Sequence, residues 1–93
     1  MDIAMQLQMQ LQAAGFRTET INGRVAVPTH GGEYISIDYY ADMARPAGHA
    51  AGYVVRYVEV RHGRDYPALP GYPDYHAGLT AADVPAHVAD LAD

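Results

Sequence analysis

The sequence predicts an α+β domain of two layers, built from a helix, four mostly antiparallel strands and a second helix, with both helices on one sheet face. Three observations support this fold class. Apolar residues have helical spacing near both ends of the chain, period-2 runs occupy its middle, and the links between these runs are too short for parallel crossovers. The 93 residues, 1–93, are expected to form a single domain.

The first helix is predicted from a segment that also resembles a strand. Residues 5–12, MQLQMQLQ, alternate apolar residues with glutamine, but Met, Gln and Leu are all good helix formers. Asp2 can cap the start of this helix, and Gly15 can end it. Met5 and Met9 then lie opposite the buried stripe, where they either face a partner or fill the rim of the core. The predicted stripe consists of Ile3, Leu7, Leu11 and Ala14.

A hairpin is expected over residues 16–28, because Asn22-Gly23 suits a two-residue type I′ turn and Pro28 can end the second strand. Residues 33–40, EYISIDYY, form the clearest period-2 strand. One face of that strand would carry Ile35, Ile37 and Tyr39, and the other would carry Tyr34, Ser36, Asp38 and Tyr40.

The fourth strand is expected over residues 52–61, GYVVRYVEVR. We expect Val54, Val58 and Val60 to point inward, and Tyr53, Val55, Tyr57 and Glu59 to point outward. This interpretation places Arg56 on the inward side, so either that position lies near an edge or the face assignment is wrong there.

Residues 62–78 are expected to form a loop rich in proline and tyrosine, because three prolines exclude a regular helix or a central strand. Long loops in small domains are often functional. A second helix is predicted over 80–92, with Thr80 as its N-cap and Asp83 completing a capping box.

Composition restricts the function. The net charge is −5, and all six basic residues are arginine, so direct nucleic-acid binding is not expected. There is no cysteine, and no apolar run is long enough to span a membrane, so we expect a cytoplasmic protein that does not bind membranes. The acidic surface favours a protein partner with a basic surface.

No catalytic, cofactor-binding or metal-binding motif is present, and the chain is not expected to be an enzyme. One alternative remains open, a small metal-dependent enzyme assembled from loop residues. Its candidate ligands are His30, His62, His76, Asp65 and Asp74.

The tyrosines give the strongest functional indication. Eight tyrosines accompany one phenylalanine and no tryptophan, and tyrosine is enriched at protein interfaces. Some would lie on the uncovered sheet face and others on the 62–78 loop, together with two acidic residues. The predicted partner-binding residues are Tyr34, Asp38, Tyr40, Tyr53, Tyr57, Glu59, Tyr66, Tyr72 and Tyr75.

In size, acidity and lack of motifs the chain resembles the small acidic proteins of phages and mobile elements, including anti-CRISPR inhibitors. That resemblance implies an inhibitor or adaptor that occupies a surface of a larger complex. The other open interpretation is a structural subunit that self-assembles, for example as a homodimer, through the exposed sheet face or through Met5 and Met9.

Overall fold

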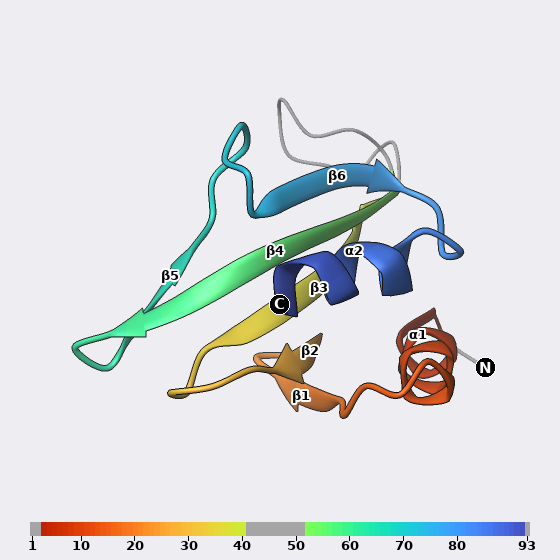
Figure 1. Ribbon diagram of the computed structural model, residues 1–93, viewed down its shortest axis with the longest axis horizontal. Helices are drawn as coiled ribbons and strands as arrows, with labels where there is room; N and C mark the ends of the chain where they lie inside the picture. Colours follow the sequence, from red (N-terminus) through yellow and green to blue (C-terminus); the bar gives the residue numbers. More distant parts are fainter. Residues whose placement is uncertain (1–2, 41–51, 93) are drawn as a thin grey trace.

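A computed structural model of the chain describes residues 3–40 and 52–92 and confirms the α+β class (Figure 1). In this part of the chain the strands form one antiparallel sheet of six strands rather than four. The two helices are α1 (Ile3–Ala13) and α2 (Val84–Ala92). The strands are β1 (Glu19–Ile21), β2 (Arg24–Pro28), β3 (Tyr34–Tyr40), β4 (Gly52–Arg61), β5 (Arg64–Pro67) and β6 (Tyr75–Leu79).

The sheet is organised around the long strand β4. One edge of β4 pairs with β3, while its other edge pairs with β5 near the C-terminal end and with β6 near the N-terminal end. The remaining strands continue outward in the order β3, β2, β1. The segment between β5 and β6 therefore leaves the sheet and returns to the same edge of β4, as Figure 1 shows.

The prediction that residues 62–78 form a loop is wrong, because this segment contains β5 and most of β6. His62 and Gly63 both have positive φ, of 53° and 74°, and form a tight turn between β4 and β5. The prolines are compatible with this hairpin because Pro67 ends a short edge strand, where no further ladder hydrogen bond is required of it. The Asn22-Gly23 turn occurs as predicted, with φ of 53° and 77°.

Helix α1 forms as expected and is capped by Gly15 after its last residue, Ala13, whereas the predicted cap Asp2 lies outside the described residues. Gly15 has a φ of 97°. The amide of Phe16 donates to the carbonyl of Leu11, and the amide of Gly15 donates to the carbonyl of Gln12. These two hydrogen bonds form a Schellman cap. Leu7 and Leu11 are buried. The predicted stripe was too wide, since Ile3 and Ala14 are exposed.

The glutamines of the opening segment attach α1 to its neighbours. Gln8 and Gln12 donate to the hydroxyls of Thr20 and Thr18, at 3.3 and 2.9 Å. Gln10 donates to the carbonyl of Ala81, just ahead of α2. Three of the four glutamines in this segment therefore connect the helix to other parts of the chain.

One hydrophobic cluster joins both helices to the sheet. It contains Leu7, Leu11, Val25, Val27, Ile35, Ile37, Val55, Val84 and Val88. A smaller cluster, made by Ala26, Tyr34 and Val58 with Ile21 beside it, occupies the opposite sheet face. Strand β3 divides between these faces as its alternation predicted.

The predicted faces of β4 are wrong, because they are reversed. Val55 pairs with Ile37 in the main cluster, while Val58 pairs with Tyr34 on the opposite face. Arg56 accordingly lies with Ser36 on the opposite face. On that face the carboxylate of Asp38 on the neighbouring strand forms an ion pair with the Arg56 guanidinium, at 3.2 Å.

Helix α2 begins at Val84, so the prediction that it starts with Thr80 as its N-cap is wrong, and the predicted Thr80–Asp83 contact lies in the turn before the helix. The hydroxyl of Thr80 donates to Asp83 Oδ2 at 2.7 Å, and its amide donates to the same oxygen at 3.3 Å. These two bonds lower the pKa of Asp83. Within the described ranges, neither helix is long and apolar enough to cross a membrane.

Candidate protein-binding cleft

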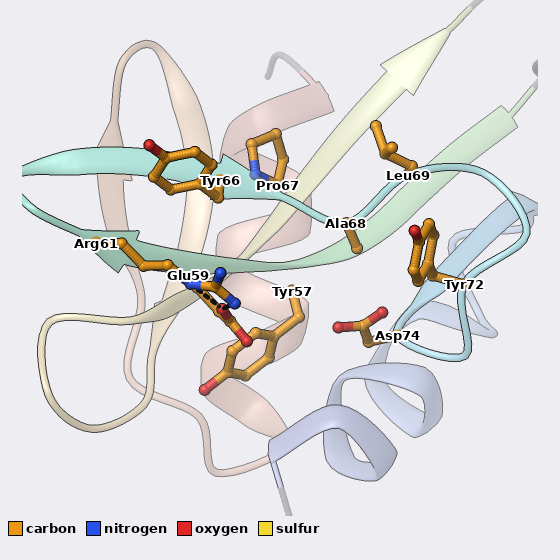
Figure 2. A pocket seen from close by; sticks show the side chains of 9 residues that line it. All are labelled: Tyr57, Glu59, Arg61, Tyr66, Pro67, Ala68, Leu69, Tyr72 and Asp74. Atoms are coloured by element: carbon orange, nitrogen blue, oxygen red, sulfur yellow. Dashed lines mark hydrogen bonds and ion pairs between the residues drawn. The ribbon is translucent and has the colours of Figure 1, made fainter.

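A cleft of about 220 Å³ opens where the end of β4 meets β5 and the segment that follows it (Figure 2). We call it the tyrosine cleft. Its lining residues are Tyr57, Glu59, Arg61, Tyr66, Pro67, Ala68, Leu69, Tyr72 and Asp74. Two backbone hydrogen bonds hold the segment against β4, from the Ala68 amide to the Tyr57 carbonyl at 2.9 Å and from the Tyr57 amide to the Asp74 carbonyl at 3.1 Å.

The rim of the cleft presents large side chains to solvent. Tyr66 is 47% exposed, Leu69 59% and Tyr72 57%. Two hydrogen bonds, each 3.1 Å long, fix the backbone around Tyr72. The amide of Tyr72 donates to the carbonyl of Leu69, and the amide of Tyr75 donates to the carbonyl of Tyr72. A fixed backbone that carries exposed aromatic groups is typical of a protein-binding surface.

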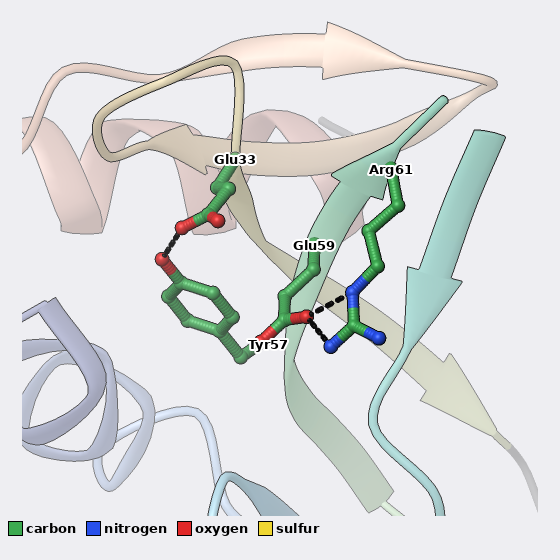
Figure 3. Close-up of polar contacts among 4 residues, drawn as sticks. All are labelled: Glu33, Tyr57, Glu59 and Arg61. Carbon is green, nitrogen blue, oxygen red and sulfur yellow. Dashed lines mark hydrogen bonds and ion pairs between the residues drawn. The ribbon is translucent and has the colours of Figure 1, made fainter. Parts of the chain in front are cut away.

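Arg61 lines the cleft with an exposed side chain and contacts two of the other lining residues. Its Nε donates to Glu59 Oε2 at 2.8 Å, and its Nη2 donates to the same oxygen (Figure 3). Its guanidinium carbon also lies 5.8 Å from the centre of the Tyr66 ring, in a cation–π arrangement. The cleft therefore already holds one guanidinium of the chain's own.

Tyr57 connects the tyrosine cleft to a second concavity. Its hydroxyl donates to Glu33 Oε2 and lies 3.4 Å from the hydroxyl of Thr29 (Figure 3). The pKa of Tyr57 is raised above its ordinary value of 10.0, mainly by burial of the hydroxyl and secondly by its hydrogen bond to Glu33. The second concavity, of about 320 Å³, shares Tyr57, Glu59 and Asp74 with the first.

The two concavities together are acidic. Glu33, Glu59 and Asp74 contribute three carboxylates to their lining, whereas Arg61 contributes one guanidinium. Among the residues that the structure describes, none forms an ion pair or side-chain hydrogen bond with the carboxylate of Asp74. Figure 2 shows this carboxylate directed into the cleft beside the Tyr72 ring.

The structure brings together four of the nine residues predicted from the sequence. Tyr57, Glu59, Tyr66 and Tyr72 all line the tyrosine cleft. Their convergence depends on the reversed face of β4, because Tyr57 and Glu59 lie on the face that also carries Val55. The sequence did not identify Leu69 as a cleft residue, although an isolated leucine between two prolines is a signal for it.

The other predicted residues lie elsewhere. Tyr53 packs against the main cluster, with its ring 5.0 Å from that of Tyr39. Tyr34 is buried on the opposite face, and its hydroxyl donates to Asp65 Oδ2 at 2.9 Å. The predicted single face that combines Tyr34, Asp38 and Tyr40 with Tyr53, Tyr57 and Glu59 is therefore wrong, because the two groups lie on opposite faces.

Asp38 belongs to an ion-pair network on the opposite face. Its Oδ1 lies 3.0 Å from Arg24 Nε, and its Oδ2 lies 3.2 Å from Arg56 Nη2. Tyr75 lies opposite Arg56 in the register of β4 and β6. Burial, and then the nearby Tyr40, raises the pKa of Tyr75. This arrangement gives Asp38 a structural role inside the sheet.

The histidines do not assemble a metal centre within residues 3–40 and 52–92, since no three metal-ligating side chains gather there. His76 instead faces His87 of α2, with ring centres 4.4 Å apart. Asp65 accepts the hydroxyl of Tyr34, and Asp74 lines the tyrosine cleft. The candidate ligands are thus distributed over separate places.

Comparison of the chain with models of protein families, with curated proteins and with solved structures gave no match.

Proposed function

We propose that this protein is a non-enzymatic binding module, an inhibitor or adaptor that uses the tyrosine cleft to occupy a basic surface of a larger protein complex. The observation that carries the proposal is the exposure of Tyr66, Leu69 and Tyr72 around one acidic cleft. Exposed apolar patches with a polar rim commonly mark interaction sites.

The openness of the cleft favours a protein partner over a metabolite. Small-molecule pockets enclose most of their ligand. In contrast, Leu69 and Tyr72 beside this cleft are each more than half exposed. Such a cleft suits one projecting side chain of a partner, while the surrounding tyrosines supply contact area.

The charge of the cleft favours a basic partner. Glu33, Glu59 and Asp74 outnumber Arg61, and the whole chain carries a net charge of −5. Complementary charge accelerates association and excludes partners with acidic surfaces. Binding is therefore expected to weaken as salt concentration rises.

Affinity capture with a matched pair of variants tests this proposal. Tagged wild-type protein, a Tyr66→Ala/Tyr72→Ala variant and a Tyr39→Ala control are incubated with lysate of the native host, with and without nuclease. Tyr39 is a suitable control because it is 49% exposed and does not line the tyrosine cleft. Thermal unfolding of each variant verifies that it is folded.

We expect one stoichiometric, nuclease-resistant protein to be captured by the wild type and by the control, and to be lost from the double variant. Retention of that protein by a folded double variant would contradict the proposed surface. Recovery of the bait alone from every lysate fraction would also contradict the proposal.

The sharpest form of this proposal is an anti-defence protein of a phage or mobile element, such as an anti-CRISPR inhibitor. Acidic groups that meet the basic, nucleic-acid-binding surface of a defence complex would act by electrostatic complementarity. This form predicts that the captured protein is a nucleic-acid-binding effector and that the captured complex has lost its nuclease or interference activity. A captured protein without nucleic-acid-binding activity would contradict this form while retaining the binding module.

A second candidate function is self-assembly through α1. Ile3, Met5 and Met9 are exposed on this helix, and a concavity beside it is lined by Ile3, Leu7 and Tyr39 among others. Sedimentation of the wild type and of Met9→Glu separates this candidate from the first. A mass that rises with concentration and reverts in Met9→Glu would support self-assembly, whereas a constant monomer mass would exclude it.

A further inference from the structure

The tyrosine cleft holds Arg61 in a way that indicates what its ligand is. Arg61 and Glu59 are neighbours on one face of β4, and their ion pair lies on the surface, with the Arg61 side chain 64% exposed. Surface ion pairs contribute little net stability, because solvent and salt compete with them. The Arg61 guanidinium can therefore leave the cleft at low cost.

The contacts of Arg61 leave much of the acidic cleft unused. The Nε and Nη2 atoms of Arg61 both donate to Oε2 of Glu59, and within the described chain no group donates to Oε1. The carboxylate of Asp74 likewise has no described partner, although it points into the same space. A guanidinium carries five N–H donors in a planar fork, which is more than Glu59 Oε2 can accept.

The aromatic part of the cleft suits the same group. Tyr66 already lies beneath a guanidinium, and the exposed Tyr72 ring lies next to Asp74. Arginine combines carboxylate recognition with stacking on aromatic rings, whereas lysine is a more strongly hydrated point charge. Two guanidinium groups would repel each other in a cleft of about 220 Å³.

From these contacts we propose that the tyrosine cleft receives an arginine side chain of the partner protein, and that this side chain displaces Arg61. The inference rests on the proposed function and specifies its ligand. The incoming guanidinium takes the place of Arg61 on Glu59 and Tyr66 and gains the carboxylate of Asp74. Arg61 is thus an internal competitor that lowers the affinity of the cleft for arginine.

Titration with small probes tests this inference without the partner. Backbone amide NMR signals of the non-proline residues in 57–61 and 66–74 are followed as N-acetyl-arginine methylamide is added to the full chain. N-acetyl-citrulline methylamide, a neutral near-isostere, serves as the matched probe. We expect saturable shifts at these amides with arginine and none with citrulline at the same concentrations.

Two arginine variants test the displacement. Arg61→Gln removes the competitor, whereas Arg64→Gln makes the same change of net charge at the residue paired with Arg61 on β5, which does not line the cleft. We expect Arg61→Gln to tighten arginine binding by about threefold to fivefold, the effect of one surface ion pair. Arg64→Gln should stay within about twofold of the wild type at 0.15 M salt.

Asp74→Asn supplies the opposite change. This substitution retains the backbone carbonyl that accepts the Tyr57 amide, and it should weaken arginine binding by at least about threefold. Equal shifts with arginine and citrulline, or unchanged or weaker arginine binding in Arg61→Gln, would overturn the inference. If either result were obtained while Tyr66→Ala/Tyr72→Ala still abolished capture of the partner, arginine recognition would be refuted, whereas the proposal of a protein-binding module would be retained.

Discussion

The ion-pair network of Asp38 provides the most informative single substitution in the sheet. In Asp38→Asn the side chain keeps its shape but loses its charge. The side chain of Asp38 is only 9% exposed, and it lies between Arg56, which is 14% exposed, and Arg24, which is 47% exposed. The variant therefore leaves the charge of Arg56 buried without a counter-charge, while Arg24 can turn into water.

The expected loss follows from that asymmetry. Removal of one partner of a buried ion pair costs about 3–5 kcal/mol, because an uncompensated charge remains in the interior. Arg24 contributes little of this cost, since half-exposed charges are well solvated. We therefore expect Asp38→Asn to lower the free energy of unfolding by about 2–4 kcal/mol.

Urea denaturation followed by circular dichroism measures this loss, with Glu59→Gln as the matched control. Glu59 also pairs with an arginine, but that pair is exposed, so its loss should cost less than about 1 kcal/mol. An unfolding free energy of Asp38→Asn within about 0.5 kcal/mol of the control would refute the buried network and, with it, the orientation of β4.

Three further predictions concern the helices and the sheet. Leu11→Ala should lower the free energy of unfolding by about 2–5 kcal/mol, whereas Met9→Ala on the exposed side of α1 should change it by less than about 0.5 kcal/mol; comparable losses would mean that α1 is rotated. Gly52→Ala should destabilise the protein more than Gly63→Ala. A Cβ at Gly52 would lie 2.9 Å from the carbonyl oxygen of Leu79, whereas a Cβ at Gly63 would have no atom within 4 Å. Equal unfolding midpoints of the two variants in urea would contradict the close contact of β4 with β6. Because the pKa of Asp83 is lowered by folding, its carboxylate stabilises the protein fully above the ordinary value of 3.8, and this stabilisation is lost as the pH falls through the lower folded value. The difference in unfolding free energy between wild type and Asp83→Asn should therefore be constant near pH 6 and shrink below about pH 4. A difference that grows in acid would contradict the contact of Asp83 with Thr80.

The sequence predicted the elements that depend on local signals. The Asn22-Gly23 turn requires positive φ at two successive residues, and the Gly15 cap requires it at one, so each can be identified from the residues themselves. The contact between Thr80 and Asp83 could also be identified from its spacing, although it lies in the turn before α2 and not in the first turn of the helix.

The faces of β4 could not be predicted because they depend on the neighbouring strand. Both Val54 and Val55 are buried, one on each face, so the valines do not distinguish the two possibilities. Arg56 does distinguish them, but only once Asp38 is known to lie beside it. A charged residue placed inward by an alternation pattern therefore deserves a search for a carboxylate on the adjacent strand.

The sequence indicated which type of residue forms the candidate site, but not where in the fold those residues come together. The excess of tyrosine indicated a binding surface, and Tyr66 and Tyr72 do lie exposed on one cleft. The hairpin at His62-Gly63 was missed because histidine is an uncommon first residue of such a turn. That hairpin brings the Tyr66 ring beneath the guanidinium of Arg61. The site therefore depends on the pairing of β4 with β5, which sequence alone did not reveal.

Site-specific photo-crosslinking tests the role of the tyrosine cleft most directly. Leu69 in one sample and Met9 in another are replaced by p-benzoylphenylalanine, since both are exposed and only Leu69 lines the cleft. After irradiation with the captured partner, we predict a covalent adduct from position 69 and none from position 9. An adduct from position 9 alone would contradict the cleft as the binding surface.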